Sequence, residues 1–128
     1  MASVAKLIAK AEQACDSAAI LLEHGDVDGA CNRPYYAMFD AARSALLATG
    51  VDQASIRTHA GLISAFGLRL VNDGRLDREL GHGLNRAHEI RLIADYTGDV
   101  VDHALAAWLV GQSRAFVAAM RRFVATAP

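Results

Sequence analysis

The sequence has few of the residues that would form a disulfide, a metal site or a membrane anchor. Its only two cysteines, Cys15 and Cys31, are too far apart for a C-x-x-C redox pair or a zinc knuckle. We therefore expect both thiols to be small buried side chains. No apolar run approaches the roughly 20 residues that a bilayer-spanning helix needs. The expectation is a cytoplasmic protein with no membrane segment.

An excess of charge of either sign is also missing. Thirteen Lys and Arg oppose fourteen Asp and Glu, for a net charge of −1, which excludes the domain-wide basic footprint typical of non-specific nucleic-acid binders. Any contact with RNA would have to come from a local patch. A hydrophobic content of 53% excludes disorder. The length of 128 residues predicts one domain, residues 1–128.

No segment shows the sustained alternation of a β-strand, whereas apolar residues recur throughout at the 3-4 spacing of helices. Capping residues and glycines delimit these segments. The expected helices run from Ser3 to Glu23, from Asp26 to Thr49, from Thr58 or His59 to Asn72, from Asp77 to Tyr96, and from Asp102 onward. Because the loops are short, successive helices should be antiparallel. The predicted fold is all-α, an up-and-down bundle of about five helices.

Pro34 interrupts this pattern in the second helix. A proline in a helix interior removes one hydrogen bond and clashes with the preceding turn, at a cost of about 3 kcal/mol. We expect either a kink near Ala30 or a short first piece followed by a new helix that begins at Pro34.

Two adjacent tyrosines stand out in the stretch Asn32–Arg43, because neighbours on a helix point about 100° apart and cannot both face a core. The stretch resembles the N-R-x-Y-Y-A-M-F-x-A-A signature of a bacterial and archaeal group in the HEPN superfamily. Further similarities follow in order along the chain: His59-Ala60-Gly61 with Phe66-Gly67, the turn Asn72–Asp77, Leu84–Ala87, and Arg91–Tyr96, which is similar to the family's R-x-x-A-D-Y.

This resemblance covers about residues 5 to 124 and implies a helical bundle that is often a homodimer. It also implies a small nucleotidyltransferase as partner, in a toxin–antitoxin-type pair. Active HEPN toxins cleave RNA without a metal, through an R-x4-6-H motif. Here Arg91 has no histidine at that offset, and His88 follows Arg86 too closely. A carboxylate such as Asp95 can act as a base but is a poor acid at neutral pH. Whether the protein is an enzyme therefore stays open at this point.

The candidate catalytic residues lie on the fourth helix: His88, Arg91, Asp95 and Tyr96. His88, Arg91 and Asp95 follow a 3-4 spacing and form a polar stripe. The guanidinium of Arg91 could bind a phosphate. Alternatively, Arg91 and Asp95 form an ordinary ion pair, and the tyrosine packs in the core with its hydroxyl on a backbone partner.

The candidate ligand-binding residues are Asn32, Arg33, Tyr36, Asp40 and His59. Arg33, Tyr36 and Asp40 share one face of the second helix, which could form the wall opposite the fourth helix, with Tyr36 stacking on a base. The alternatives are an ion-pair ladder of Asp40 with Arg33 or Arg43, core packing of Tyr36, and a purely structural His59.

Histidine spacing does not fit a metal site, and Gly81-His82-Gly83 lies within a helix rather than in a phosphate-binding loop. We expect neither a metal nor a cofactor. On the fifth helix, Trp108 and Phe116 belong to a stripe that should be core, or a homodimer interface if one side is exposed. The function that we predict is RNA or nucleotide binding beside a nucleotidyltransferase partner. The alternatives are a variant metal-independent endoribonuclease toxin and a non-catalytic scaffold dimer. No DNA contact is expected.

Overall fold

A computed structural model describes residues 3–126, and these residues form α-, 3-10 and π-helices without a strand. The elements in order are α1 (Val4–Glu23), α2 (Val27–Ala48), the 3-10 helix η1 (Gln53–Ile56), α3 (His59–Phe66) with the π-helical η2 (Gly67–Val71), α4 (Arg78–Leu92) with the π-helical η3 (Ile93–Thr97), and α5 (His103–Thr126). The all-α expectation is confirmed.

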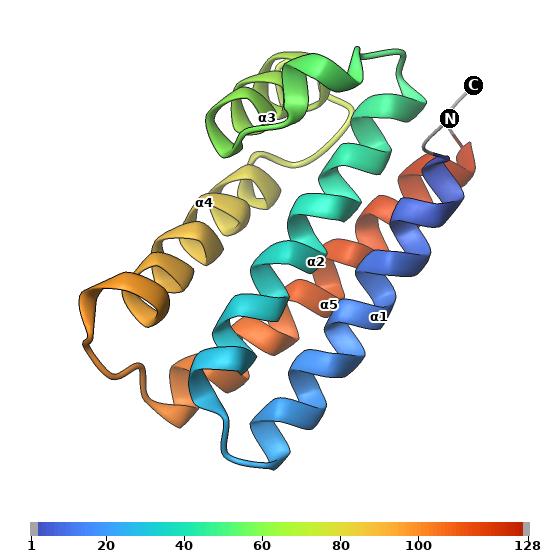
Figure 1. Cartoon of the computed structure of the whole chain (residues 1–128). Coiled ribbons are helices and arrows are strands. Elements are labelled where there is room, and N and C mark those ends of the chain that lie inside the picture. Colours follow the sequence, from blue (N-terminus) through green and yellow to red (C-terminus); the bar gives the residue numbers. More distant parts are fainter. Residues whose placement is uncertain (1–2, 127–128) are drawn as a thin grey trace.

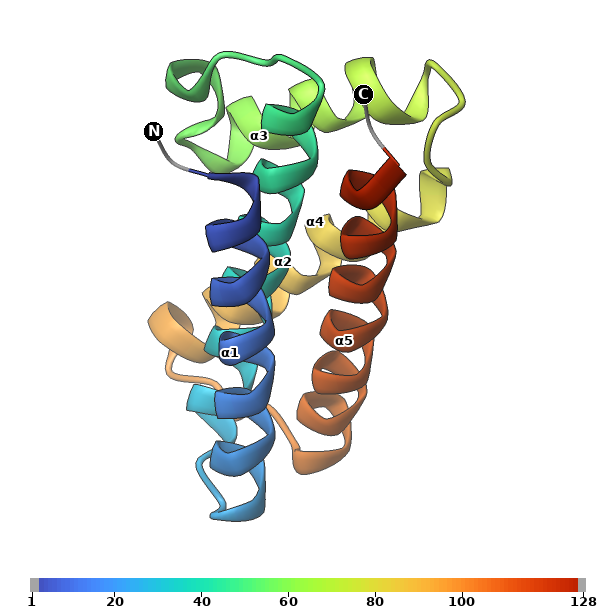
Figure 2. The same cartoon turned by 90° about the vertical axis from the view of Figure 1, so that its right-hand side faces the viewer.

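The helix α2 is the centre of the bundle. It packs against α1 and α5 along most of its length and against α4 on another side. Figure 1 shows α1, α2 and α5 side by side, α4 beside α2, and α3 across one end of the bundle. Successive long helices alternate in direction, so α1 begins and α5 ends at the same end, as Figure 2 also shows. The up-and-down topology is confirmed.

The helix starts are those that the capping residues predict. Ser3 Oγ accepts a hydrogen bond from the Lys6 amide at 2.9 Å, and Asp26 Oδ1 accepts one from the Gly29 amide at 2.9 Å. Thr58 caps α3 in the same way. These side chains satisfy amide groups that the first helical turn leaves unpaired.

Of the two alternatives expected at Pro34, a new helix that begins at the proline is wrong. The second helix is continuous from Val27 to Ala48 with the proline inside it, so no new helix begins there. The proline ring is buried against the core. Packing of α2 against three other helices offsets the cost of the hydrogen bond that residue 34 cannot donate to the Ala30 carbonyl.

The core lies where α2 meets α1, α4 and α5. Its largest fully buried side chains include Met38, Leu46, Phe66, Leu84 and Met120. Both cysteine thiols are buried and unpaired, as expected. On α5 the predicted stripe divides, because Phe116 is buried whereas Trp108 is 45% exposed. No helix within residues 3–126 is long and apolar enough to cross a membrane.

Candidate functional site

Two histidines from different helices are stacked at the junction of α2, α3 and α4. The rings of His59, the first residue of α3, and His88, in α4, lie 3.8 Å apart between centroids and 10° from parallel. The ring of Tyr35, from α2, packs against both. Three segments that are far apart in the sequence thus each contribute one ring to an aromatic cluster.

Hydrogen bonds fix the orientation of the His59 ring. The Tyr35 hydroxyl lies 3.1 Å from His59 Nδ1, and His59 Nε2 lies 3.0 Å from Asn85 Oδ1. Because the amide oxygen of Asn85 can only accept, Nε2 carries the proton and Nδ1 accepts from the tyrosine. Burial raises the pKa of Tyr35 to about 12, which keeps its hydroxyl protonated as a donor.

Gly61 allows α3 to start where it does. A Cβ at this position would lie 2.5 Å from the Ser55 carbonyl oxygen, so any other residue would push η1 and α3 apart. The close approach of these two elements positions the first turn of α3. It therefore also positions His59, which lies two residues before Gly61 in the same turn.

Arg91, from the last turn of α4, is the central cation of the site. Its guanidinium carbon lies 4.7 Å from the ring centroid of Tyr35 and 5.6 Å from that of Tyr36. One terminal nitrogen is 3.5 Å from Asp95 Oδ2, and the other is 3.5 Å from His88 Nδ1. The side chain is only 13% exposed, so these contacts hold it in one orientation.

The surroundings of His88 disfavour its protonation. Burial, the neighbouring His59 and the Arg91 cation all lower the pKa of this imidazole. With Nδ1 accepting from the guanidinium, the neutral ring carries its proton on Nε2. The site therefore holds two stacked imidazoles, those of His59 and His88, beside a permanent positive charge.

Asp95 ties α2 to the π-helical end of α4. Asn32 Nδ2 donates a hydrogen bond of 2.8 Å to the same Asp95 oxygen that Arg91 approaches. The carboxylate is thus used to hold the arginine and the two helices.

A cleft of about 350 Å³ opens over this cluster. Its lining residues come from α2, α3, α4 and the segment before α3: Tyr35, Tyr36, Phe39, Asp40, Arg43, Arg57, His59 and Arg91. The cleft thus contains three arginines and one carboxylate. The Nε atoms of Arg43 and Arg91 have no acceptor within residues 3–126.

Asp40 is the one acidic residue of the cleft. It lies 3.5 Å from Arg43 and its side chain is 15% exposed. Burial raises the pKa of this carboxyl, while Lys10 and Arg43 oppose that change. The predicted ion-pair ladder is found only in part, because Asp40 pairs with Arg43 but not with Arg33 among residues 3–126.

The structure brings most of the predicted site residues together, but not all. Seven of the nine lie in or directly against the cluster: Asn32, Tyr36, Asp40, His59, His88, Arg91 and Asp95. Arg33 lines a neighbouring hollow instead. Tyr96 is 73% exposed and lines none of the cavities described. Core packing, the favoured alternative for Tyr36 and Tyr96, is wrong for both, since Tyr36 is 41% exposed.

Sequence reasoning missed four residues of the site. Tyr35 is buried, and helical spacing does not reveal that its hydroxyl contacts His59, while Arg57 lies before α3 and belongs to no pattern that indicates the cleft. Arg43 was considered only as an ion-pair partner. Asn85 lies three residues before His88 on the same helix face, and this spacing could have revealed it.

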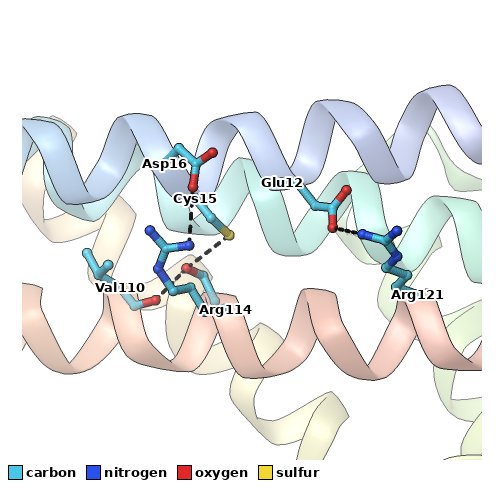
Figure 3. Close-up of polar contacts among 7 residues, drawn as sticks. Glu12, Cys15, Asp16, Val110, Arg114 and Arg121 are labelled. Carbon is cyan, nitrogen blue, oxygen red and sulfur yellow. Dashed lines mark hydrogen bonds and ion pairs between the residues drawn. The ribbon is translucent and has the colours of Figure 1, made fainter.

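The largest of the cavities described here for residues 3–126 lies elsewhere, between α1 and α5. It measures about 570 Å³, and its rim carries two ion pairs, Arg114 with Asp16 at 3.2 Å and Arg121 with Glu12 at 2.5 Å (Figure 3). The acidic residues come from α1 and the arginines from α5, so two of the three arginines that line the groove are paired across it, and Arg122 is the third. Within residues 3–126, no cluster of three or more His, Cys, Asp or Glu side chains is placed to hold a metal.

The fold and the site together define a small helical domain. It is an up-and-down bundle with a cluster of arginine, histidine and tyrosine side chains between α2, α3 and α4. The chain is a member of the HEPN family, since the model of the HEPN domain matches residues 4–123. The chain is 40% identical over 92 residues to "UPF0332 protein glr0978" of Gloeobacter violaceus, covering 72% of this chain and 71% of the relative.

Two archaeal relatives have more informative names. The chain is 33% identical over 111 residues to "Putative toxin MJ0605" of Methanocaldococcus jannaschii, covering 87% of this chain and 81% of the relative. It is 30% identical over 95 residues to "Putative toxin MJ0142" of the same organism, covering 74% and 63% respectively.

Proposed function

We propose that this protein is the toxin-type member of a toxin–antitoxin pair. We also propose that it binds RNA or a nucleotide in the cleft between α2, α3 and α4. The observation that carries the proposal is the mostly buried Arg91, held over two tyrosine rings with Arg43 and Arg57 in the same cleft. The toxin names of two relatives support the same class of function.

The chemistry of the cleft suits a phosphate with a base attached. Arginine presents a planar fork of donors that matches phosphate oxygens, and three arginines line the cleft. The half-exposed ring of Tyr36 offers a surface on which a base can stack. The net charge of the chain is near zero, so binding depends on this local excess of arginine.

The partner that we propose is a small nucleotidyltransferase, an expectation that comes from the resemblance between this sequence and paired HEPN proteins. A second copy of the chain is the other expected partner, with the half-exposed Trp108 at the interface. Co-expression of the tagged chain with the product of the adjacent gene tests the first partner. Recovery of the chain alone would contradict that part of the proposal.

The direct test measures binding of short single-stranded RNA and of a nucleoside monophosphate to the wild type and to Arg91→Ala. We expect the variant to lose at least tenfold in affinity while its helical circular dichroism is unchanged, because a charge-assisted hydrogen bond contributes about 1.5–3 kcal/mol. Arg114→Ala is the matched control, since it removes an arginine from the α1–α5 groove. Equal affinities for all three proteins would refute the proposal.

A second candidate function is metal-independent RNA cleavage. The observation in its favour is the stacked pair of imidazoles beside Arg91, of which His88 has a lowered pKa. In this version His88 serves in place of the histidine missing from the R-x4-6-H motif, and Arg91 stabilises charge on the phosphate. RNA cleavage in the presence of EDTA, abolished by both His88→Ala and Arg91→Ala, would support it. Binding of RNA without cleavage would contradict this second function and leave the first one standing.

A further inference from the structure

The arginine-lined cleft does not end at Tyr36. A second hollow of about 500 Å³ lies between α1 and α2, and Tyr36 and Asp40 line both cavities. The two hollows therefore adjoin at this pair of side chains. We refer to the pair of adjoining hollows as the trough, which extends over α2 from the start of α3 to α1.

The far hollow has its own cations. Lys10, from α1, and Arg33, from α2, line it together with the polar Ser17. Neither cation makes an ion pair within residues 3–126. This contrasts with the α1–α5 groove, where carboxylates already occupy two of the arginines. Both side chains are thus without a close carboxylate partner, although Lys10 acts at longer range on the Asp40 carboxyl that lines the same hollow.

Between the two groups of cations the trough changes character. Its middle is formed by the half-exposed Tyr36 ring and by Asp40, whose carboxylate would repel a phosphate but can accept a hydrogen bond from a ribose hydroxyl or a base amino group. The order along the trough is therefore cations, an aromatic ring with a carboxylate, and cations again. This order matches a single strand whose phosphates lie at the two ends of the trough and whose base lies between them.

The length of the trough also exceeds one nucleotide. Arg33 and Arg43 are ten residues apart on one helix, which separates them by ~15 Å along its axis at ~1.5 Å per residue. A stacked strand advances ~3.4 Å per nucleotide, so the trough accommodates at most about four nucleotides. A mononucleotide could reach only one of the two groups of cations.

We infer that the Lys10–Arg33 hollow is a second phosphate-binding subsite and that the ligand is a short single-stranded RNA whose base stacks on Tyr36. This inference rests on the proposed function, because the first phosphate must lie in the cleft with Arg91. It adds the form of the ligand, single-stranded and longer than one nucleotide. A base within a duplex is already stacked and could not lie against the tyrosine ring.

The experiment compares a labelled hexauridylate with uridine monophosphate, each titrated into the full chain over a series of salt concentrations. Each phosphate contact to a single strand contributes about 0.7 to the slope of log K against log salt. We expect Lys10→Ala/Arg33→Ala to lower the hexauridylate slope by about 1.4 and to leave binding of the monophosphate unchanged. Tyr36→Ala should weaken hexauridylate binding by roughly 5- to 150-fold.

The matched control is Lys6→Ala/Arg69→Ala, which removes the same charges from exposed positions that line none of the cavities described. It should retain the wild-type slope. An unchanged slope in Lys10→Ala/Arg33→Ala, with binding still dependent on Arg91, would overturn the second subsite but leave the proposed function standing. Absence of binding to either ligand by the wild type would overturn both. Duplex RNA that binds as tightly as the hexauridylate would overturn the stacking role of Tyr36.

Discussion

The α2–α4 cluster and the α1–α5 groove are both lined by arginines and carboxylates, yet they use them differently. In the groove, each of two acidic residues on α1 pairs with an arginine on α5, and both partners remain largely exposed (Figure 3). In the cluster, the guanidinium of Arg91 is mostly buried, lies over two aromatic rings and contacts a neutral histidine.

The two regions differ in size, charge and lining. The groove is the larger of the two, but carboxylates pair with two of its three arginines and it has no aromatic lining. The smaller cleft has an excess of cations and a tyrosine ring available for stacking. The fixed orientation of Arg91 and the Nε–H groups that lack an acceptor distinguish the cleft from the groove. Variants in both regions test this distinction.

The largest difference should appear when one arginine is removed from each region. Arg91→Met should lower the free energy of unfolding by about 2 kcal/mol, because it leaves the partly buried Asp95 without its cation. Arg114→Met should cost less than about 0.5 kcal/mol, since its ion pair is exposed. Urea unfolding with an unchanged m-value measures both. Similar losses in the two variants would remove the distinction.

Removal of one hydroxyl from each region should have a smaller effect. Tyr35→Phe leaves His59 Nδ1 without its donor and should cost about 1 kcal/mol. Ser113→Ala removes a hydroxyl that donates to the Val110 carbonyl of its own helix, and should cost about 0.5 kcal/mol or less. Thermal unfolding of both variants at pH 8 provides the comparison. A larger loss for Ser113→Ala would reverse our ranking of the two networks.

The pH dependence of stability should also distinguish the regions. An unfolded histidine titrates near pH 6.5, whereas the pKa of His88 is lower in the folded chain because of burial, His59 and Arg91. The unfolded state therefore binds more protons, and stability is lost as the pH falls from about 6.5 through the folded pKa.

His88→Phe should reduce this loss of stability, because the variant cannot take up the proton. Arg114→Met should retain the wild-type dependence, since the α1–α5 groove contains no histidine. Urea midpoints measured between pH 8 and pH 5 provide the test. An identical pH dependence in His88→Phe and the wild type would show that His88 is not the titrating group.

The smallest effect is expected for the second ion pair of the groove. A double-mutant cycle of Glu12→Ala and Arg121→Ala should give a coupling energy of about 0.5 kcal/mol or less, because both side chains are well exposed. The coupling should also fall in 1 M salt. A coupling above about 2 kcal/mol would mean that the groove is as tightly organised as the cluster.

Much of the fold could be predicted from the sequence, because it depends on local signals. Ser3, Asp26, Thr58 and Asp77 each accept a hydrogen bond from the first turn of the expected helix. The Arg91–Asp95 pair follows from helical spacing alone and is present at 3.5 Å. Such features need only one helix for their geometry.

The stack of His59 on His88 could not be predicted in the same way. Periodicity assigns a residue to a helix face, but it does not fix the height and angle at which two helices cross. That crossing depends on packing at positions such as Gly61, where α3 meets the Ser55 carbonyl. For the same reason, the contiguity of the Tyr36 hollow with Lys10 becomes visible only in three dimensions.

The proline inside α2 has a consequence for the motions of the site. Because residue 34 has no amide proton, the helical ladder is interrupted between the turn that carries Asn32 and Arg33 and the turns that follow. Opening of the first two turns of α2 therefore breaks fewer cooperative bonds than opening elsewhere in that helix. Amide exchange should be faster in residues 28–33 than in residues 38–46. The half of the trough that contains Arg33 would therefore fluctuate, while the half that contains Arg43 stays ordered.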